Sequence, residues 1–411
     1  MNVGVMLTEV APQAGGGFTF ERELLAALLG VGSESRHRFT LFAPPGGLPD
    51  LPRGGHFEIV TLPAARRTVE RLRSSAWKVI RVLTKSGRRE RRRAQKVGWR
   101  ERLLLASDVD LMWYLAPGAA TMEIPYITVV WDLQHRLQPF FPEVSGEAQW
   151  DLRERQYAAV LRRAAIVIAG TQAGKAEIER FYQVPPERIR ILPHPTPQFA
   201  FWPPTGDDEQ VLARLGLRPG YIVYPAQFWP HKNHVGLLRA LRILRDERGV
   251  ALDAVFLGAD KGNRPYVERI AAELGLSARL HLPGFVTQEE LVVLYRNALA
   301  LGYVSYFGPE NLPPLEAFAA GCPVVAADVP GSDEQLADAA LRVDPRDERQ
   351  IADAIYRIHS DPALRASLVA RGRERAHRFR PEDFVRGVLA IVDELEPIRD
   401  CWAPGPGYRE L

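Results

Sequence analysis

The residues best suited to chemistry lie between positions 307 and 325, where an apolar run gives way to a helical pattern. Pro314 fits the first turn of a helix, since the N–H that proline lacks has no helical partner there. The free N–H groups near Asn311 and Leu312 then lie at a helix N-terminus, which favours a phosphate group. Glu316 could accept both hydroxyls of a ribose, or it could cap the helix and offset its dipole. The residues alone leave both interpretations open.

A lysine in the loop between Tyr224 and His234 is a second candidate for chemistry. The loop follows an expected strand and precedes an expected helix, and ligands of open α/β sheets bind beyond the carboxyl ends of the strands. Lys232 would therefore extend its ammonium group into that crevice. A departing diphosphate gains charge in the transition state, and a cation can stabilise this charge without a metal. The alternative is a simply solvated lysine.

The first half of the chain adds a run of glycines, 15–17, directly after its first expected strand. Glycines let the backbone approach a ligand closely, although such a run could also be a flexible turn. It does not read GxGxxG, which argues against a nicotinamide enzyme. Asp132 and His135 follow another expected strand, where His135 could serve an acceptor hydroxyl or be a packing histidine. Trp131 beside them could stack on a sugar or pack in the core.

Other chemical signatures are missing from the sequence or weak. No His or Cys set has zinc spacing, and no GxSxG elbow occurs. Asp108 and Asp110 form an Asp-x-Asp, which we interpret as a solvated turn before a strand. The sequence therefore predicts neither a metal site nor a bound cofactor.

The elements that must position these residues follow an α/β pattern. Short apolar runs alternate with helical patterns, which predicts parallel sheets covered on both faces. A proline-rich link over 193–204 divides the alternation into two halves. Two doubly wound, Rossmann-like domains facing each other across a cleft are the expected fold class. The expected strands are Val3–Leu7, Phe39–Ala43, Glu58–Leu62, Leu111–Tyr114, Ile127–Val130, Ile166–Ala169, Tyr221–Tyr224, Ala254–Leu257, Leu280–Leu282, Ala298–Val304 and Pro323–Ala326.

The composition is that of a globular protein of two domains. The 411 residues are 46% hydrophobic and 25% charged, and no apolar run approaches the roughly 20 residues that span a bilayer. The first strand begins almost at once, so we expect no signal peptide. Two cysteines, Cys322 and Cys401, form neither a disulfide framework nor a metal cluster. We therefore expect a cytoplasmic protein.

The charge is concentrated in one segment. Residues 66–102 hold fifteen Lys or Arg against three Glu, a net charge of +12 in a chain whose total is +3. Apolar residues, Trp77 among them, recur there at three- and four-residue spacing. This pattern is typical of an amphipathic helix at an anionic membrane surface, and a helix packed on the sheet with a solvated basic face is the alternative. No nucleic-acid-binding module accompanies the charge, so we expect no nucleic-acid partner.

The stretch LPPLEA at Leu312–Ala317, with GCPVV at Gly321–Val325, resembles the donor site of the "glycosyl transferases group 1" family of retaining GT-B enzymes. The resemblance implies that Glu316 binds the donor ribose. The family places another glutamate eight positions earlier, where this chain has Gly308. Glu310 could substitute for it.

The resemblance extends more loosely to both halves of the chain. It implies that Lys232 clamps the donor diphosphate, with Gln227 near the position of a family arginine. It also implies that Gly15–Gly17 form the glycine loop, in which Gly16 and Gly17 bind the donor. Gly258 matches a strand-to-glycine turn, and Val286 falls in the segment that holds the nucleobase. A His-Asp pair of the family corresponds to Trp131 and Asp132. The catalytic candidates are Asp132, His135 and Lys232, and the donor-binding candidates are Gly16, Gly17, Gln227, Lys232, Gly258, Val286, Glu310, Asn311, Leu312 and Glu316.

The resemblance also implies an activity, and it implies that each domain binds a different substrate. Residues 1–200 would bind the acceptor and residues 201–380 the nucleotide sugar, with residues 381–411 packing back on the first domain. A hexose would pass with retention and without a metal from GDP-mannose or a UDP-sugar to a glycan or lipid-linked acceptor of the cell surface. The enzyme would then work in the cytoplasm, at the inner membrane face if the 66–102 block binds it. The alternatives are a non-catalytic GT-B subunit and an anionic-surface binding protein acting through residues 66–102.

Overall fold

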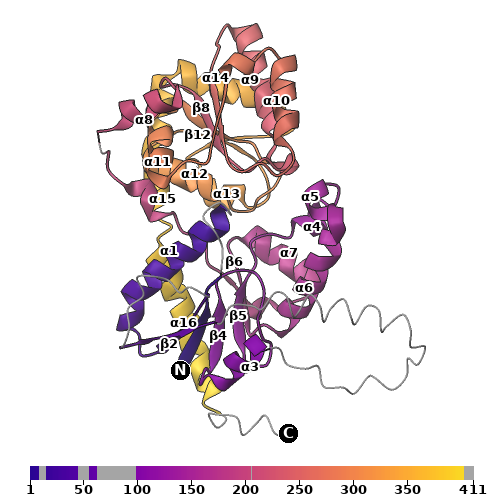
Figure 1. Cartoon of the computed structure of the whole chain (residues 1–411), viewed down its shortest axis with the longest axis vertical. Helices are drawn as coiled ribbons and strands as arrows, with labels where there is room; N and C mark the ends of the chain where they lie inside the picture. Colours follow the sequence, from indigo (N-terminus) through magenta and orange to yellow (C-terminus); the bar gives the residue numbers. More distant parts are fainter. Residues whose placement is uncertain (9–14, 45–54, 63–98, 205, 402–411) are drawn as a thin grey trace, which may run out of the picture.

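The computed structural model describes residues 1–8, 15–44, 55–62, 99–204 and 206–401, which form two α/β domains stacked along the long axis of the molecule (Figure 1). The N-terminal sheet is parallel throughout, with strand order β3-β2-β1-β4-β5-β6-β7. Its strands are β1 Asn2–Met6, β2 Arg38–Ala43, β3 Phe57–Thr61, β4 Leu111–Tyr114, β5 Tyr126–Val129, β6 Ile166–Ala169 and β7 Ile189–Ile191.

The helices cover both faces of this sheet, which explains the apolar runs. Along β4, Leu111 and Trp113 point into a core cluster with α1 and α16, whereas Met112 and Tyr114 point into the cluster with α6 and α7. Side chains of a strand alternate between faces, so a strand covered on both sides is apolar at every position. The helices of this half are α1 Gly16–Val31, α3 Trp99–Ala106, α4 Gln134–Leu137, α5 Pro142–Ser145, α6 Gln149–Arg163 and α7 Gln172–Tyr182.

The C-terminal sheet is also parallel, with strand order β10-β9-β8-β11-β12-β13. Helices α9, α10 and α14 pack together, as do α8, α11, α12 and α15. The strands are β8 Ile222–Pro225, β9 Ala254–Leu257, β10 Leu280–Gly284, β11 Ala300–Tyr303, β12 Val324–Ala327 and β13 Leu341–Val343. The helices are α8 Asp208–Leu215, α9 His234–Arg248, α10 Arg264–Glu273, α11 Gln288–Asn297, α12 Leu312–Ala320, α13 Ser332–Leu336, α14 Glu348–Ser360, α15 Pro362–His377 and α16 Pro381–Arg399.

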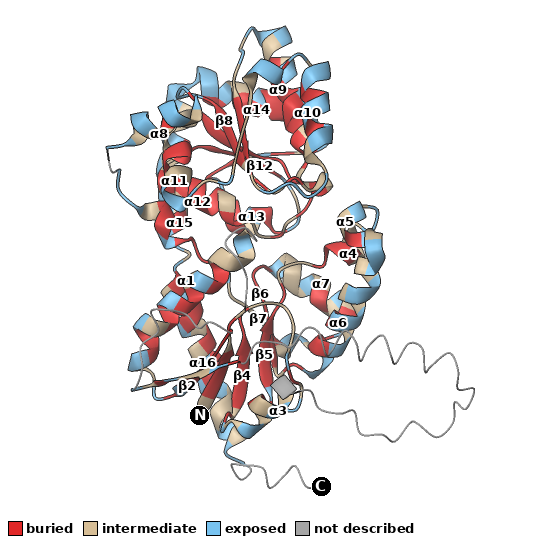
Figure 2. Cartoon of the chain, viewed as in Figure 1, coloured by how far each residue is buried: buried red, intermediate tan, exposed pale blue. Residues whose placement is uncertain are grey.

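The chain crosses between the domains twice. The proline-rich link is fastened to the end of α15, because Thr196 donates from its backbone to Phe379 and from its hydroxyl to Ala376. Helix α16 then returns to the N-terminal domain and packs along α1, with Phe384 edge-on to Phe20 at 5.5 Å. Both sheets are buried under their helices, and the carboxyl edges of the sheets face each other (Figure 2).

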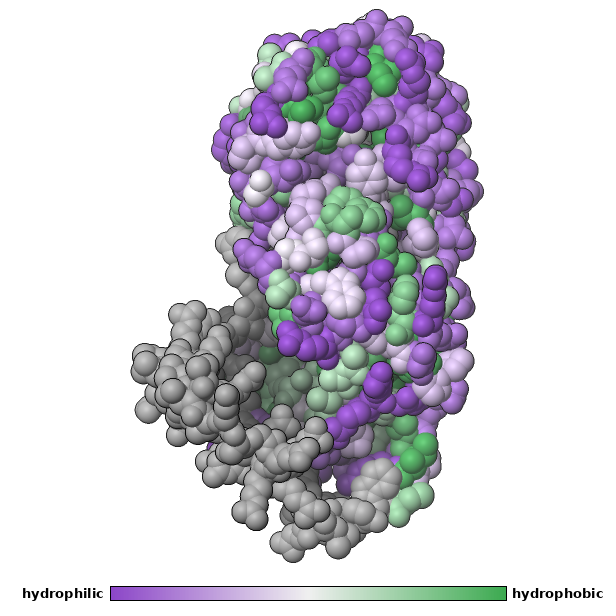
Figure 3. Space-filling model, turned by 90° about the vertical axis from the view of Figure 1, so that its right-hand side faces the viewer, coloured by the Kyte–Doolittle hydropathy of each residue, from purple (hydrophilic) through white to green (hydrophobic). Residues whose placement is uncertain are grey.

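The outer surface of the molecule is mixed in character. On the face shown in Figure 3, hydrophilic side chains predominate and apolar ones are interspersed among them. Most of the basic segment 66–102, with its expected amphipathic helix, lies outside the described residues, which resume at 99. Among the described helices, none has the length and apolarity needed to cross a bilayer.

Candidate active site

The loop between β8 and α9, residues 227–233, is called the donor loop below. It ends in the 3-10 turn Pro230–Lys232 and in Asn233, whose positive φ of 56° reverses the chain before α9. The Asn233 side chain accepts the Gly236 amide at 3.1 Å and donates to the carbonyls of Val304 and Pro345. Because this buried amide fastens the loop to two other segments, Lys232 projects from a rigid support.

Lys232 lies beside the N-terminus of α12. Its Nζ donates to the Tyr303 hydroxyl at 3.0 Å, and this hydroxyl donates to Asn311 Oδ1 at 3.0 Å. Asn311 is the N-cap residue of α12. A cation and the positive end of a helix therefore converge on the same point, which is an arrangement that attracts a phosphate group.

The polar groups of Asn311 form hydrogen bonds with neighbouring residues at this point. Its amide N–H donates to Gln335 Oε1 at 3.1 Å, and its side chain donates to the Gly308 carbonyl at 2.9 Å. Gly308 has a φ of +137°, and a Cβ there would lie 2.5 Å from Asn311 Nδ2. A glutamate at position 308 would therefore displace Asn311, so the glycine belongs to this packing.

Glu316 is buried in α12 at 6% exposure. Its Oε2 accepts the Tyr295 hydroxyl at 2.7 Å. Burial raises its pKa to about 7; the bond from Tyr295 opposes this shift, and the Glu23 carboxylate adds to it. Since Glu23 belongs to α1, the carboxylate of Glu316 lies near the other domain, and its role in holding a ribose stays a prediction.

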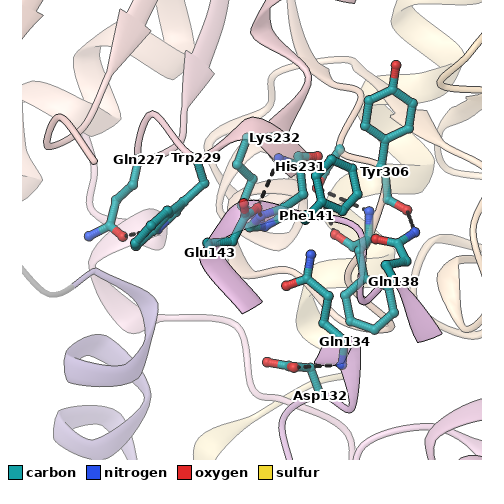
Figure 4. A network of polar contacts seen from close by, with 12 residues as sticks. Asp132, Gln134, Gln138, Phe141, Glu143, Gln227, Trp229, His231, Lys232 and Tyr306 are labelled. Atoms are coloured by element: carbon teal, nitrogen blue, oxygen red, sulfur yellow. Dashed lines mark hydrogen bonds and ion pairs between the residues drawn. The ribbon is translucent and has the colours of Figure 1, made fainter. Parts of the chain in front are cut away.

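The glycine loop faces the C-terminal domain. A Cβ on Gly15 would lie 3.7 Å from Gln227 Nε2, and one on Gly16 would lie 3.6 Å from Leu312 Cδ1. A Cβ on Gly17 would lie 2.9 Å from the Trp131 ring, so Trp131 packs directly on this glycine. The loop therefore brings Gly15 to the donor loop and Gly16 to α12, whereas Gly17 packs on Trp131 within the N-terminal domain. Gln227 accepts Trp229 Nε1 at 3.0 Å in the same region (Figure 4).

Glu310 points away from the Lys232 group and into the N-terminal domain. Its Oε1 accepts the His194 amide at 2.7 Å, and a Cβ on Gly170 would lie only 1.2 Å from its Oε2. Burial raises its pKa to about 8, although the His194 amide opposes this and the Glu334 carboxylate adds to it. In this closed arrangement Glu310 is an interdomain contact, and a role in holding the transferred sugar would require it to move.

His135 is fully buried rather than exposed to the cleft. Its Nε2 lies 3.0 Å from the Tyr182 hydroxyl and 3.3 Å from Glu154, and its ring stacks on Tyr157. Burial is the main reason that its pKa lies below its ordinary value. This position is that of the packing histidine left open by the sequence and does not support contact with an acceptor hydroxyl.

Asp132 remains at the carboxyl edge of the N-terminal sheet. Its Oδ1 accepts the Gln134 amide at 3.0 Å and pairs with Arg153 at 3.2 Å. Glu177 lies near it, and burial followed by repulsion from Asp132 raises the pKa of Glu177 to about 7. Asp132 is thus partly exposed at this edge, whereas His135 is fully buried, and a catalytic role of Asp132 stays a prediction.

The remaining donor candidates have structural explanations. Gly258 has a φ of +128°, and a Cβ there would lie 2.6 Å from the Ala226 carbonyl, so glycine is needed for the turn beside the donor loop. Val286 packs against the C-terminal core. Their contact with a nucleotide stays a prediction.

Two residues between the domains, Tyr303 and Glu334, are not marked as site residues by the sequence. Tyr303 links Lys232 to Asn311, and its place at the end of a buried strand was the available signal. Glu334 accepts the amides of Gln172 and Ala173 at the N-terminus of α7, at 2.7 and 3.0 Å. No sequence pattern marks this contact, since it joins two domains.

Part of the chain is similar in sequence to a known protein family. Residues 212–375 match the family described as "Glycosyl transferases group 1". D-inositol 3-phosphate glycosyltransferase from Salinispora arenicola is 31% identical over an alignment of 268 residues that covers 61% of this chain and 58% of that protein. O-antigen chain mannosyltransferase B from Escherichia coli is 26% identical over 239 residues that cover 58% of this chain and 63% of that protein. The chain thus spans less than two thirds of the length of either relative.

A solved structure extends the likeness to both domains. The crystal structure of Anabaena HepE in complex with UDP-glucose has a TM-score of 0.63 and 17% identity, with 96% of this chain and 100% of that chain covered. At this identity the likeness shows the fold alone. Residues 212–375 of this chain therefore match the glycosyl transferases group 1 family, and the two facing parallel-sheet domains of the chain have the GT-B fold.

Proposed function

We propose that this chain is a glycosyltransferase that takes a hexose from a nucleoside-diphosphate sugar. The observation that carries the proposal is the convergence of Lys232, Tyr303 and the N-cap of α12 on one point of the cleft. The reaction must separate a sugar from a diphosphate, and the leaving diphosphate gains charge as the bond breaks. An ammonium group and a helix N-terminus supply positive potential where that charge would develop.

The remaining donor residues fit the parts of such a molecule. Glu316 has carboxylate oxygens for the ribose hydroxyls, and the Gly15–Gly17 loop, which has no side chains, lies next to α12, where its backbone could approach a diphosphate. UDP-glucose in HepE and the mannosyltransferase name of the Escherichia coli relative support a UDP-sugar or GDP-mannose as the donor. We propose retention through attack from the side of the leaving group, in which the diphosphate receives the acceptor proton. This route uses no metal and no protein nucleophile.

The acceptor would bind on the N-terminal domain beside Asp132, which pairs with Arg153 at the carboxyl edge of that sheet. We propose a glycan or lipid-linked acceptor of a cell-surface polysaccharide, in keeping with the O-antigen relative. The net charge of +12 on residues 66–102 would bring the enzyme to an anionic membrane from the cytoplasmic side.

The first experiment is a thermal-shift titration with UDP and GDP in EDTA. A nucleotide at about 100 times its Kd stabilises the protein by about 2.7 kcal/mol, which raises the Tm of a domain of this size by roughly 5–10 °C. Lys232→Ala should weaken the binding of the preferred nucleotide by about 10- to 100-fold, since a charged hydrogen bond is lost. Lys175→Ala, which removes an ammonium paired with Glu179 on α7, is the matched control.

The outcomes separate the proposal from its alternatives. Unchanged nucleotide affinity in Lys232→Ala would refute the site. Tight binding without release of sugar from any UDP- or GDP-sugar would identify a non-catalytic GT-B subunit instead.

A further inference from the structure

We infer that Glu143 is a positioning residue, which fastens the N-terminal domain to the donor loop through His231; this inference rests on the proposed function. The segment 138–143, called the clasp below, lies between β5 and α6 and reaches across to the other domain (Figure 4). Glu143 and His231 belong to different domains, and neither was singled out by its sequence context.

The contact between the two residues is close and buried. Glu143 Oε1 lies 2.5 Å from His231 Nδ1 and accepts the His231 backbone amide at 3.1 Å. The two side chains are 6% and 11% exposed. Burial is the main cause that holds the pKa of His231 below its ordinary value, so the ring is neutral near pH 7 and must carry its proton on Nδ1 for this contact. A neutral N–H then donates to a carboxylate, which is a charge-assisted hydrogen bond.

Two further contacts make the clasp an extended interdomain junction. Gln138 Nε2 donates to the Tyr306 carbonyl at 2.9 Å. The Phe141 ring lies 5.9 Å from the Tyr306 ring and 6.1 Å from the His231 ring (Figure 4). Tyr306 in turn donates its amide to the His231 carbonyl at 2.8 Å. The clasp therefore holds two neighbouring segments of the C-terminal domain at once.

The position of His231 connects the Glu143–His231 contact to the proposed diphosphate site. His231 directly precedes Lys232, and the Lys232 carbonyl accepts the Tyr224 hydroxyl at 2.5 Å. The donor loop is thus fixed within its own domain, and Glu143 adds the connection to the other domain. Loss of Glu143 should leave the loop able to bind a diphosphate but should reduce the population of the closed cleft in which an acceptor meets the donor.

Some buried polar atoms of the clasp have no hydrogen-bond partner in the described part of the chain, so the contact between the clasp and the C-terminal domain is reversible. Two buried atoms of the clasp lack hydrogen-bond partners among the described residues, Glu143 Oε2 and Gln138 Oε1, and so does Gln134 Nε2 just before the clasp. Buried polar atoms without partners are costly, so closure through the clasp is only weakly favoured by itself. A single strong contact such as Glu143–His231 can then decide whether the domains stay together.

The test compares Glu143→Ala, Glu143→Gln and the control Glu187→Ala with the wild type. Glutamine keeps an oxygen that can accept both His231 N–H groups, whereas alanine removes it. Glu187 is exposed and lies just before β7, so it is at the amino edge of the N-terminal sheet, away from the other domain. Its loss should therefore leave the scattering, the binding and the turnover unchanged. Three measurements are needed: the radius of gyration by small-angle X-ray scattering, the Kd of UDP and GDP by calorimetry, and the kcat and KM for the donor. Circular dichroism and the Tm verify folding.

For Glu143→Ala we expect a larger radius of gyration, a nucleotide Kd within about 2-fold of wild type and a kcat lower by about 10- to 100-fold. Glu143→Gln should retain the wild-type radius and a kcat within about 3-fold. The inference is overturned if Glu143→Ala scatters and turns over like wild type, or if Glu143→Gln loses as much as Glu143→Ala. If the wild type binds neither nucleotide, the proposed function fails, and the scattering comparison still decides whether Glu143 holds the domains together.

Discussion

Glu310 should make the stability of the closed protein depend on pH. Its carboxyl group is buried between the domains, against Gly170 and the His194 amide. Its pKa is raised to about 8, first of all by burial. His194 supplies no opposing charge, since burial lowers its pKa to about 4, and Glu334 adds negative potential. Glu310→Gln removes the titration and keeps an oxygen for the His194 amide.

The direction and the size of this pH dependence follow from the protonation of Glu310 in the folded and the unfolded chain. Between the ordinary value of 4.5 and the folded value of about 8, the folded protein binds the Glu310 proton more tightly than the unfolded chain does. The stabilisation that the Glu310 proton contributes is therefore complete below pH 4.5 and is lost as pH rises toward 8. At about 1.4 kcal/mol per pH unit, the loss from pH 6 to pH 8 is roughly 2 kcal/mol as an order of magnitude. For a domain of this size that corresponds to a Tm lower by about 4–8 °C.

The assay is a pair of melting curves, wild type and Glu310→Gln, at steps from pH 5.5 to 8.5. Glu316, Glu23 and Glu177 also have pKa values raised to about 7, but they are present in both proteins and cancel in the difference. We expect the Tm of Glu310→Gln to increase relative to that of the wild type as the pH rises. A Tm difference that stays constant over this range would refute the buried, neutral state of Glu310.

Three further substitutions and one control variant test the residues between the domains. Tyr303→Phe should weaken UDP or GDP binding by about 3- to 10-fold in calorimetry, because it breaks the link from Lys232 to Asn311; Tyr306→Phe, whose hydroxyl points away from the polar network in Figure 4, should bind like wild type. Gly308→Ala should lower stability in urea by about 1–3 kcal/mol, since its Cβ would overlap Asn311 at a positive φ. Glu334→Ala should cost about 0.5–2 kcal/mol in the same assay by exposing the N-terminus of α7.

The sequence predicts the sheets well where burial is complete. β4 and β9 occupy the same residues as expected, because strands covered on both faces consist of uninterrupted apolar residues. The edge strands β7 and β13 lacked this signal. Each has three residues, is only partly buried and carries an arginine, Arg190 or Arg342, in its middle. At an edge the pairing with one neighbour defines the strand, and pairing is not visible in one sequence.

The site residues likewise differ in whether a local stretch of the sequence marks them. Lys232 and Asn311 could be found because each lies where a strand gives way to a helix, which is a local property of the chain. Their link through Tyr303 and the direction of Glu310 depend on segments that meet only after folding. His135 was ambiguous for the same reason, since a histidine after a strand faces the cleft or the core according to how α4 packs.

Helix α13 contacts both the N-terminal domain and the proposed diphosphate site. Its consecutive residues Glu334 and Gln335 occupy two helix N-termini: Glu334 accepts amides of α7 in the N-terminal domain, and Gln335 accepts the Asn311 amide at α12. A phosphate oxygen that took the Asn311 amide would displace Gln335, and a shift of so short a helix would strain the Glu334 contact next to it. Donor binding would then loosen one interdomain contact. The clasp at Glu143 lies on another element and would keep the domains together during that change.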